Sequence, residues 1–444
     1  MRDRIRLASE EGTGGRAAKS RRVTPLRRRL IVAIAVSALA TQAAHAANGP
    51  KPPQGFWVAG DLHVHTIYGH DTCITPTQAW DPSTPNRAAR TSCDAPYTVS
   101  FTPAQRFGEA LSRGLSFLTI SDHNNVVNQT DPDELAWRAA HPSFVAIPAY
   151  ENSQPGHVQM LGARACYSNT GPIAGATVEC DHDVTDQSAA GETALADALR
   201  ANGGVFQINH PSDMSWLSKF GHTVVPDTVE VWNIGPWIYQ HPFPASNDNN
   251  FSLDWYDGFL RAGYEVGATG GSDSHWVITD PAQGVGEPTT WVFVRALTVQ
   301  GVLDGIRAHH TFVSALPPAL LGPQLLLEAD GNGDGVFEAI AGSETRPGST
   351  FRARTVGALP GSILRIVTDA GSTDVTLGAS TSYTFRPGLN GLPTAASFVR
   401  AELLEPDARA ARQQTCDPIL EQLKSTLCAD DLLMESLTSP IFVR

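Results

Sequence analysis

The residues in this sequence best able to do chemistry are histidines and carboxylates that stand at the ends of short apolar runs. His63 and His65 form an H-x-H pair. Because residues two apart in a strand face the same side, this spacing aims both imidazoles at one point. Residues of the same types hold comparable positions later in the chain: His123, Glu151, His157, His210, Asp273 and His275. Burying one ionisable group costs several kcal/mol unless it is paired or bound to a metal, so this repetition predicts a metal site.

Imidazole and carboxylate ligands suit zinc, manganese and iron. A catalytic zinc takes about three protein ligands and keeps a position for water, so this set of residues is large enough for two or three ions. Glu151 is the residue we expect to bridge two of them. Coordination lowers the pKa of water from about 16 to about 7 and so supplies a hydroxide at neutral pH, while neighbouring ions stabilise charge on the attacked centre. The predicted catalytic residues are His63, His65, Glu151, Asp273 and His275.

The elements that must position these residues alternate between strand-like and helical patterns from residue 56 to about 315. Strands are expected at 56–61, 115–121, 144–149, 157–161, 205–209, 228–232, 265–269 and 290–294. Helical patterns lie at 103–113, 192–201, 252–262 and 298–308. This alternation predicts an α/β fold with a largely parallel sheet, either doubly wound or closed as a barrel. In both forms the active site lies at the carboxyl ends of the strands.

The composition changes after residue 316, where Pro, Gly, Ser and Thr separate short strands such as 362–368 and 381–385. We expect residues 319–444 to form a small C-terminal β-sandwich-like domain with a helical insert around 407–433. Asp330, Asn332 and Asp334 resemble the start of a calcium loop. Position twelve of that loop is Ala341, not the glutamate of an EF-hand, although Glu338 could partly compensate. A turn without metal is the alternative.

The N-terminal residues 1–46 have the pattern of a secretory signal. An arginine-rich stretch precedes the apolar run 30–40, and small residues mark a cleavage site near Ala46. The run is too short to span a bilayer after cleavage, so we expect a periplasmic or secreted protein without a stable membrane span. Residues 47–55 are a linker. The route of export and the oligomeric state stay open.

Charge and cysteine content agree with export. The formal net charge is −13, and losing residues 1–46 removes ten basic and three acidic residues, which leaves −20. A surface this acidic repels phosphate backbones, so no nucleic-acid partner is expected. Six cysteines permit 15 pairings but fall into local couples. In an oxidising compartment, these couples favour three disulfides: 73 with 93, 166 with 180, and 416 with 428.

The motifs together resemble the PHP (polymerase and histidinol phosphatase) superfamily of metallohydrolases. The resemblance covers about 56–318 and rests on the segments 60–66, 121–123, 210–211 and 271–275. The stretches 147–152 and 155–162 look more like its CehA/McbA-like branch, which includes carbaryl hydrolase. The resemblance implies a distorted seven-stranded (β/α) barrel that holds three ions.

The same resemblance implies how the ligands would be divided. One ion would use His63, His65, Glu151 and Asp273, and a second would share Glu151 and add His157 and His210. A third would use Asp71, His123 and His275. At Asp71 the sequence departs from the family pattern, because an insertion follows that runs to about residue 97. His70 could replace Asp71 there.

The function predicted from these observations is that of an exported metal-dependent hydrolase acting on a small-molecule ester. Most of the superfamily resemblance favours phosphoesters, and the closer branch favours carbamate, ester or amide bonds. Few basic residues beyond Arg164 and Lys219 stand near the motifs, which favours a neutral substrate over a phosphate monoester. The alternative is a non-catalytic surface or glycan-binding protein that metals merely stabilise.

Overall fold

The structure, a computed structural model, describes residues 51–69, 101–154, 156–212, 216–234, 249–275, 284–406 and 433–444. Several predictions fall outside these residues. They are the signal at 1–46, Asp71, the cysteine couples 73/93 and 416/428, and all but one residue of the helical insert at 407–433. Lys51–Arg444 forms one compact unit. Each strand and helix predicted between 56 and 308 overlaps an observed element.

Strand β1 (Phe56–Val64) carries the H-x-H pair at its end and lies inside an 11-stranded sheet. On one side β1 pairs in parallel with β2 (Phe117–Ile120), and β2 pairs in parallel with β3 (Val145–Pro148). On its other side β1 pairs antiparallel with β11 (Thr289–Val294). The last seven residues of β1 are buried, as expected for a strand covered on both faces.

The helices beside this sheet begin at clear capping signals. Helix α2 (Pro103–Ser112) starts with a capping box, in which Thr102 and Gln105 each accept a hydrogen bond from the other's backbone N–H. Helix α3 (Pro132–Ala140), preceded by the 3₁₀ turn η3 (Val127–Thr130), was not predicted. Its signal is Asp131 followed by proline, and the Asp131 side chain caps two N–H groups of the first turn.

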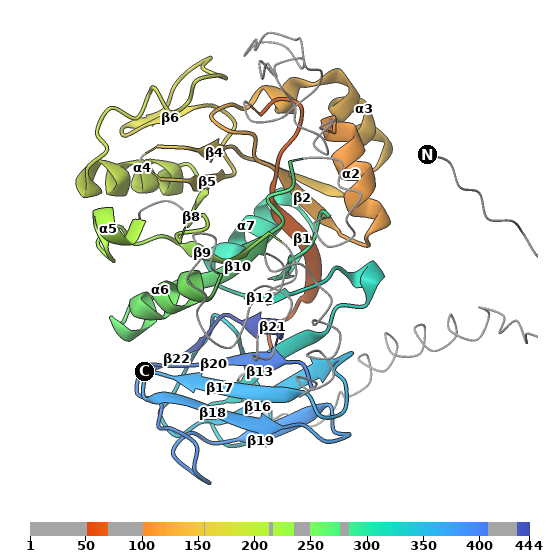
Figure 1. Ribbon diagram of the computed structural model, residues 1–444, viewed down its shortest axis with the longest axis vertical. Helices are drawn as coiled ribbons and strands as arrows, with labels where there is room; N and C mark the ends of the chain where they lie inside the picture. Colours follow the sequence, from red (N-terminus) through yellow and green to blue (C-terminus); the bar gives the residue numbers. More distant parts are fainter. Residues whose placement is uncertain are drawn as a thin grey trace, which may run out of the picture. The chain divides into compact units, whose positions relative to one another are not determined.

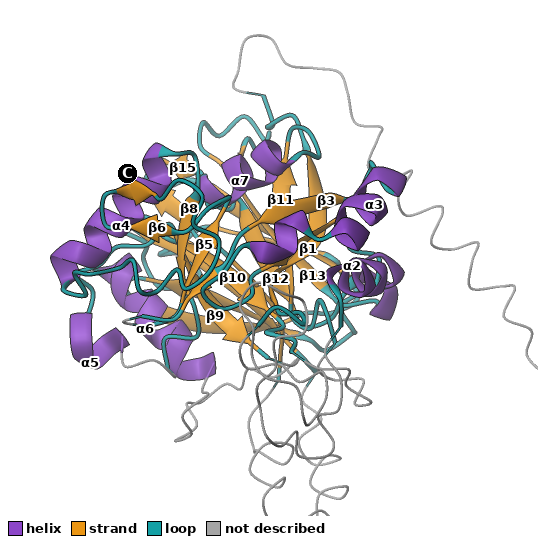
Figure 2. Cartoon of the chain, turned by 90° about the horizontal axis from the view of Figure 1, so that it is seen from above, coloured by secondary structure: helices purple, strands orange, loops and turns teal. Residues whose placement is uncertain are grey.

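A second sheet has five strands, in the order β10 (Gly267–Gly271), β9 (Thr228–Asn233), β8 (Val205–Ile208), β5 (Val158–Leu161) and β4 (Glu151–Asn152). Its helices are α4 (Ala189–Ala201), α5 (Trp216–Phe220) and α6 (Asn249–Arg261). Figure 2 shows these helices on one side of the strands and α2 and α3 on the other. The β8–β9 and β9–β10 pairs are parallel, whereas β5 is antiparallel to both its neighbours. The predicted largely parallel sheet is therefore mixed.

The barrel that the family resemblance implies is not found as a closed sheet among the described residues, where its strands lie in two open sheets. Along the edge of β10 that faces away from β9, side-chain hydroxyls form the hydrogen bonds that the backbone of a neighbouring strand would otherwise form. Thr290 in β11 accepts from the Gly270 N–H (2.8 Å) and donates to its carbonyl (2.7 Å). At Ala268, Ser439 accepts from the N–H (2.8 Å) and Thr311 donates to the carbonyl (2.7 Å). These hydroxyls satisfy β10 without continuing the sheet.

The C-terminal strands form a sandwich that shares the 11-stranded sheet. Strand β12 (Thr311–Ser314) follows α7 (Val299–Arg307) and pairs with β21 (Met434–Thr438), as Figure 1 shows. The rest of this half comprises β20 (Phe398–Leu404), β22 (Ile441–Val443), β15 (Glu344–Thr345), β17 (Ile363–Thr368) and β18 (Gly371–Thr376). The facing sheet consists of β14 (Ala339–Ile340), β13 (Gln324–Asp330), β16 (Thr350–Val356) and β19 (Ser382–Phe385). A core that includes Leu327, Phe351 and Leu403 lies between them.

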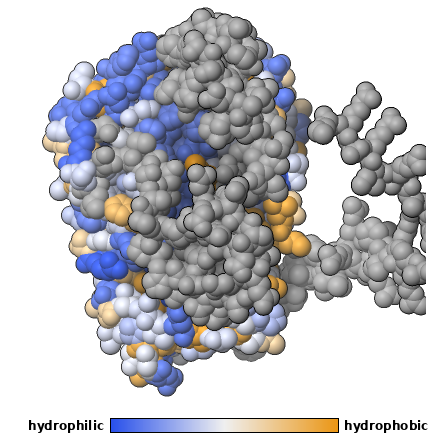
Figure 3. All heavy atoms as spheres, viewed as in Figure 1, coloured by the Kyte–Doolittle hydropathy of each residue, from blue (hydrophilic) through white to orange (hydrophobic). Residues whose placement is uncertain are grey.

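Three short elements complete the described fold: the pair β6 (Tyr167–Ser168) and β7 (Gly171–Pro172), and the 3₁₀ turn η4 (Pro318–Leu320). No helix among the described residues is both long and apolar enough to cross a bilayer. The described surface on the face drawn in Figure 3 is mainly hydrophilic, with hydrophobic residues in small separate areas.

Candidate metal centre

The structure brings together the eight predicted ligands that lie in its described part. Glu151 and Asp273 both face the H-x-H pair. The Nε2 atom of His63 lies 3.1 Å from Glu151 Oε2 and 3.2 Å from Asp273 Oδ1, and the Nε2 atom of His65 lies 3.4 Å and 3.1 Å from the same two oxygens. Two imidazoles and two carboxylates thus surround one point.

Glu151 also faces three further histidines, two from the second sheet and His123 from the loop after β2. Its Oε1 atom lies 3.0 Å from His157 Nδ1 and 3.3 Å from His210 Nε2, and its Oε2 atom lies 3.3 Å from His123 Nδ1. Asn209 donates a hydrogen bond to Oε1 (2.9 Å) and so orients the carboxylate. This central position suits Glu151 to the predicted role of bridge.

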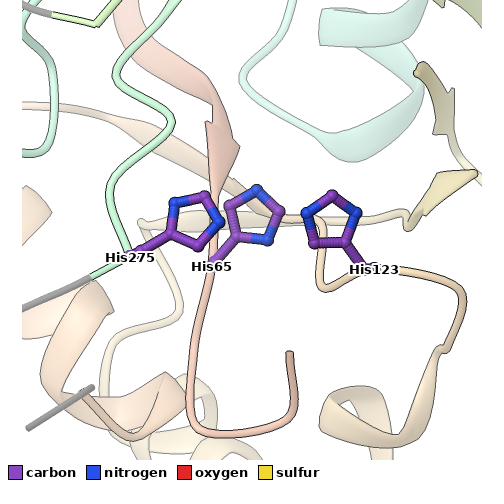
Figure 4. A group of neighbouring side chains, drawn as sticks. All are labelled: His65, His123 and His275. Carbon is purple, nitrogen blue, oxygen red and sulfur yellow. The ribbon is translucent and has the colours of Figure 1, made fainter. Parts of the chain in front are cut away.

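A third group consists of histidines alone. The rings of His65 and His275 stack with centroids 3.9 Å apart, and those of His65 and His123 are 4.7 Å apart. Figure 4 shows the three imidazoles side by side, with His65 in the middle. Their nitrogens could hold an ion, as could three further groups: His63–His65–Glu151, His63–His210–Asp273 and His123–Glu151–His157. Asp71, predicted to join His123 and His275, lies outside the described residues.

The backbone after β8 and β10 turns sharply to deliver these side chains. His210 and Asp273 have φ values of 23° and 49°, in the left-handed region that residues with a Cβ seldom adopt. Two hydrogen bonds hold the second turn against β1, from Asp273 N to His63 O (2.8 Å) and from His65 N to Ser274 O (3.0 Å). At Gly271 a Cβ would lie 2.4 Å from that of His63, so only glycine permits this approach.

The unsatisfied atoms of this cluster fit bound cations. Four of the ligand atoms that face one another have no hydrogen bond of acceptable geometry to any described residue: His63 Nε2, His157 Nδ1, Glu151 Oε2 and Asp273 Oδ1. Buried polar atoms nearly always have a partner, because an unmet one costs free energy. Imidazole nitrogens and carboxylate oxygens are the donors that zinc, manganese or iron would accept.

Charges within the cluster shift its pKa values strongly. Burial opposes a charge on His63, but the carboxylates of Asp273, Glu151 and Glu230 raise its pKa well above the usual value. Burial likewise opposes ionised Glu151 and Asp273, yet His63 and the other nearby histidines hold both pKa values well below normal. Protons therefore occupy the metal-free cluster, and a binding ion must displace them.

Two buried ionisable residues, Asp61 and Arg106, form hydrogen bonds to the backbone of the ligand segments. Asp61 accepts hydrogen bonds from the N–H groups of His63 (3.0 Å), Ser272 (3.1 Å) and Gly286 (2.7 Å), and burial raises its pKa to about 6. Arg106, fully buried, donates to the carbonyls of His65 and Ser274, at 3.0 Å each. These two residues connect the end of β1 to the loop after β10.

The sequence analysis missed several residues that contact predicted ligands, among them Glu230 and Ser153. Glu230 lies 2.9 Å from His63 Nδ1, and Ser153 lies 2.9 Å from His123 Nδ1. Glu230 did leave a signal, because it is a single carboxylate within the otherwise apolar run Val229–Trp232. Ser153 left none, since nothing distinguishes it from other loop serines.

The other sequence predictions have mixed outcomes. The Cys166–Cys180 disulfide is confirmed, and Cys180 N donates to the carbonyl of Asn124 (2.8 Å), next to His123. In the calcium-like loop, carboxylates of Asp330, Asp334 and Glu338 lie close enough to hold an ion. However, both Asp330 oxygens already accept backbone hydrogen bonds, from Gly333 and Gly335. Calcium binding at Asp330, Asn332 and Asp334 stays a prediction.

Comparison with known proteins adds little to this geometry. No family model and no curated protein matches the chain. Among solved structures, it is similar to a two-domain protein from Bacteroides vulgatus ATCC 8482 that contains a predicted PHP-like metal-dependent phosphoesterase. The two share 16% identity over 89% of this chain and 100% of that one, with a TM-score of 0.38. A TM-score this low does not establish a shared fold, so the chemistry rests on the residues of this chain.

Proposed function

We propose that this chain is an exported metal-dependent hydrolase of the PHP superfamily that cleaves an ester-type bond. One observation carries the proposal. Six histidines and two carboxylates meet at strand ends, and four of their facing ligand atoms are buried without a hydrogen bond to any described residue. Bound divalent ions would activate water at neutral pH and stabilise charge on the attacked centre.

Each residue of the cluster has a role in this proposal. His63, His65 and Asp273 hold one ion from the ends of β1 and β10. Glu151 contributes to that group and to a second one with His157 and His210, which supports its role as a bridge. His275 and His123 flank His65 and would complete a third group.

For the substrate we propose an uncharged ester or carbamate rather than a phosphate monoester, in keeping with the CehA/McbA-like branch. The described polar side chains that contact predicted ligands from outside the set include the neutral groups Asn209, Asn233 and Ser153. A phosphate monoester carries about two negative charges and is normally met by Arg or Lys. A phosphoester remains the second candidate.

The test compares His63→Ala with the matched control His182→Ala, because the side chain of His182 is 70% exposed and pairs only with Glu179 among described residues. Both proteins and the wild type are assayed for metal content and for hydrolysis of 4-nitrophenyl phosphate, 4-nitrophenyl acetate and a naphthyl carbamate. We expect His63→Ala to lose metal and more than about 100-fold in kcat/KM, and His182→Ala to retain both.

Different results would separate the alternatives. Full metal occupancy in the wild type without hydrolysis of any of these esters would favour the non-catalytic surface or glycan-binding protein. Hydrolysis of the phosphate alone would reject the proposed substrate class and keep the hydrolase.

Export is proposed from the N-terminal pattern, and the Cys166–Cys180 disulfide supports it because disulfides persist in oxidising compartments. Mass spectrometry of protein from the periplasm or medium tests it. We expect a mature N-terminus near residue 47, and an intact N-terminus on cytoplasmic protein would contradict the proposal.

A further inference from the structure

Glu230 is a buried carboxylate in the middle of an apolar strand. It stands third in β9, all six residues of which are buried, and its own exposed fraction is 0%. Strand β8, which leads to His210, lies on one side of β9, and β10, which leads to Asp273, lies on the other. A glutamate in this position must be held by specific partners to offset its burial.

Its two oxygens reach predicted ligands from three different strands. Oε1 lies 2.9 Å from Nδ1 of His63. Oε2 accepts hydrogen bonds from the backbone N–H of His210 (3.1 Å) and from Nδ2 of Asn233 (3.0 Å). Asn233 Nδ2 also contacts Asp273 Oδ2 (3.3 Å), so Glu230 reaches this ligand through one amide.

The contact with His63 determines which ring nitrogen is available to an ion. When the ring of His63 binds an ion through Nε2, its one remaining proton lies on Nδ1, which then donates to the carboxylate of Glu230. Nε2 itself faces Glu151 and Asp273, at 3.1 and 3.2 Å. A carboxylate placed behind a histidine in this way orients the ring and makes it a more basic ligand.

The contact with His210 acts on the backbone. The φ of His210 is 23°, which a residue with a side chain adopts only where its surroundings impose it. The hydrogen bond from its N–H to Glu230 is one such constraint. Glycine at 271 leaves room for the carboxylate, because a Cβ there would lie 2.5 Å from Glu230 Oε1.

We propose that Glu230 is a positioning residue of the metal centre, which fixes the tautomer of His63 and the backbone of His210 so that both present unprotonated nitrogens to the ions. The inference rests on the proposed function, since it assumes that the cluster binds metal. It assigns Glu230 no contact with substrate.

The experiment titrates metal-free wild type, Glu230→Gln and Glu192→Gln with Co²⁺, following the visible spectrum and competing with a chelator. Glu192 is the matched control. It is equally buried, and its carboxylate has no hydrogen-bond partner among the described residues. Burial raises its pKa to about 8, so glutamine there changes little at neutral pH. We expect Glu230→Gln to weaken Co²⁺ binding by about 10- to 100-fold and to change the spectrum, and Glu192→Gln to match the wild type.

A measurement on the wild-type protein tests the same inference even if Glu230→Gln does not fold. In zinc-loaded protein with ¹⁵N-labelled histidine, the His63 signal, assigned by its loss in His63→Gln, should show a protonated Nδ1 and a metal-bound Nε2. Zinc on Nδ1, or equal Co²⁺ affinity and spectrum in Glu230→Gln, would overturn the inference alone. A wild type that binds neither Co²⁺ nor Zn²⁺ would instead overturn the proposed function.

Discussion

His63 and His210 hold their protons more firmly in the folded chain than in water, because buried carboxylates surround both. For each, burial opposes the charge but Glu151 and its neighbours raise the pKa. A histidine with a raised folded pKa stabilises the fold fully below its unfolded pKa of about 6.5, and this contribution is lost as pH rises through the folded pKa. Glu151 and Asp273, whose pKa values are depressed, contribute constant stability above about pH 4.5.

We therefore expect the chelated protein to lose stability as pH rises above about 6.5. In the metal-loaded protein, unprotonated histidines are required, so its stability should hold or increase over the same range. Thermal unfolding with and without EDTA between pH 6 and 9 measures both. Parallel pH profiles would show that the cluster binds no ion.

Glu151 and His275 should differ in how much metal they hold. Glu151 belongs to two of the groups that could hold an ion, whereas His275 belongs to one. Glu151→Gln should lose metal from both groups and more than about 100-fold in kcat/KM, and His275→Ala should lose one ion at most. Elemental analysis after dialysis against excess zinc decides this. Equal losses would contradict the bridging role.

The sequence predicted the candidate metal ligands better than the residues that hold those ligands in position. The H-x-H pair and the residues after each strand follow from strand periodicity and from the position of active sites in α/β folds. Glu230 and Arg106 act through residues that lie 167 or 168 positions away, at His63 and Ser274. No local pattern contains such a partner, so a single sequence shows at most that a charged residue stands in an apolar run.

At the scale of elements, Arg106 connects two sheets that no continuous ladder joins. It lies on α2 and donates to the carbonyls of His65 and Ser274, and its third partner is Glu109 (3.1 Å). The forked guanidinium reaches all three at once, which the single ammonium of lysine cannot do.

Arg106→Lys should therefore destabilise the protein by about 2–4 kcal/mol, since two hydrogen bonds from a charged donor are lost. It should also weaken metal binding, because both carbonyls belong to ligand segments. Arg138→Lys, on a partly exposed arginine that pairs with Glu134, is the control and should change stability by less than about 0.5 kcal/mol. Urea denaturation compares them, and equal effects would argue against the connecting role.

Helices and strands were largely predictable, but their assembly was not. Every element predicted between 56 and 308 overlaps an observed one, whereas α3 and β12 were missed although they are as long as the predicted α7 and β2. The barrel that the resemblance implies was not confirmed among the described residues, for a different reason. On the edge of β10 that faces away from β9, the backbone is bonded by the hydroxyls of Thr290, Thr311 and Ser439, which look like ordinary polar residues in the sequence.

At the scale of the whole described unit, one buried ion pair ties the α/β part to the sandwich. Arg400 in β20 donates to both oxygens of Asp257 in α6, at 2.8 and 2.7 Å, and also to Glu402. Arg400 is only 2% exposed and Asp257 3%, so neither charge could be left without a partner at low cost.

Arg400→Met should destabilise the protein by about 3–5 kcal/mol, because it removes the closest cation of the buried Asp257 and leaves only the longer contact with Arg261 (3.5 Å) among the described residues. The double variant Arg400→Met/Asp257→Asn should recover part of this loss. Since β12 and β21 pair within one sheet, we expect a single unfolding transition in urea, followed by both near-UV circular dichroism and tryptophan fluorescence. Two transitions, with only one affected by the substitution, would show that the parts unfold independently.

The hydroxyl contacts at the edge of β10 also determine when this strand can complete its folding during translation. Ser439, which accepts from the Ala268 N–H, is translated 171 residues after it. Until the ribosome has made Ser439, that edge of β10 has a backbone donor without its final partner, although Asp273 and His275 have long been translated. The nascent chain would thus carry all its metal ligands before it could finish the strand that positions two of them. Co-translational folding of this protein should be late, and release from a chaperone should coincide with docking of the last strands.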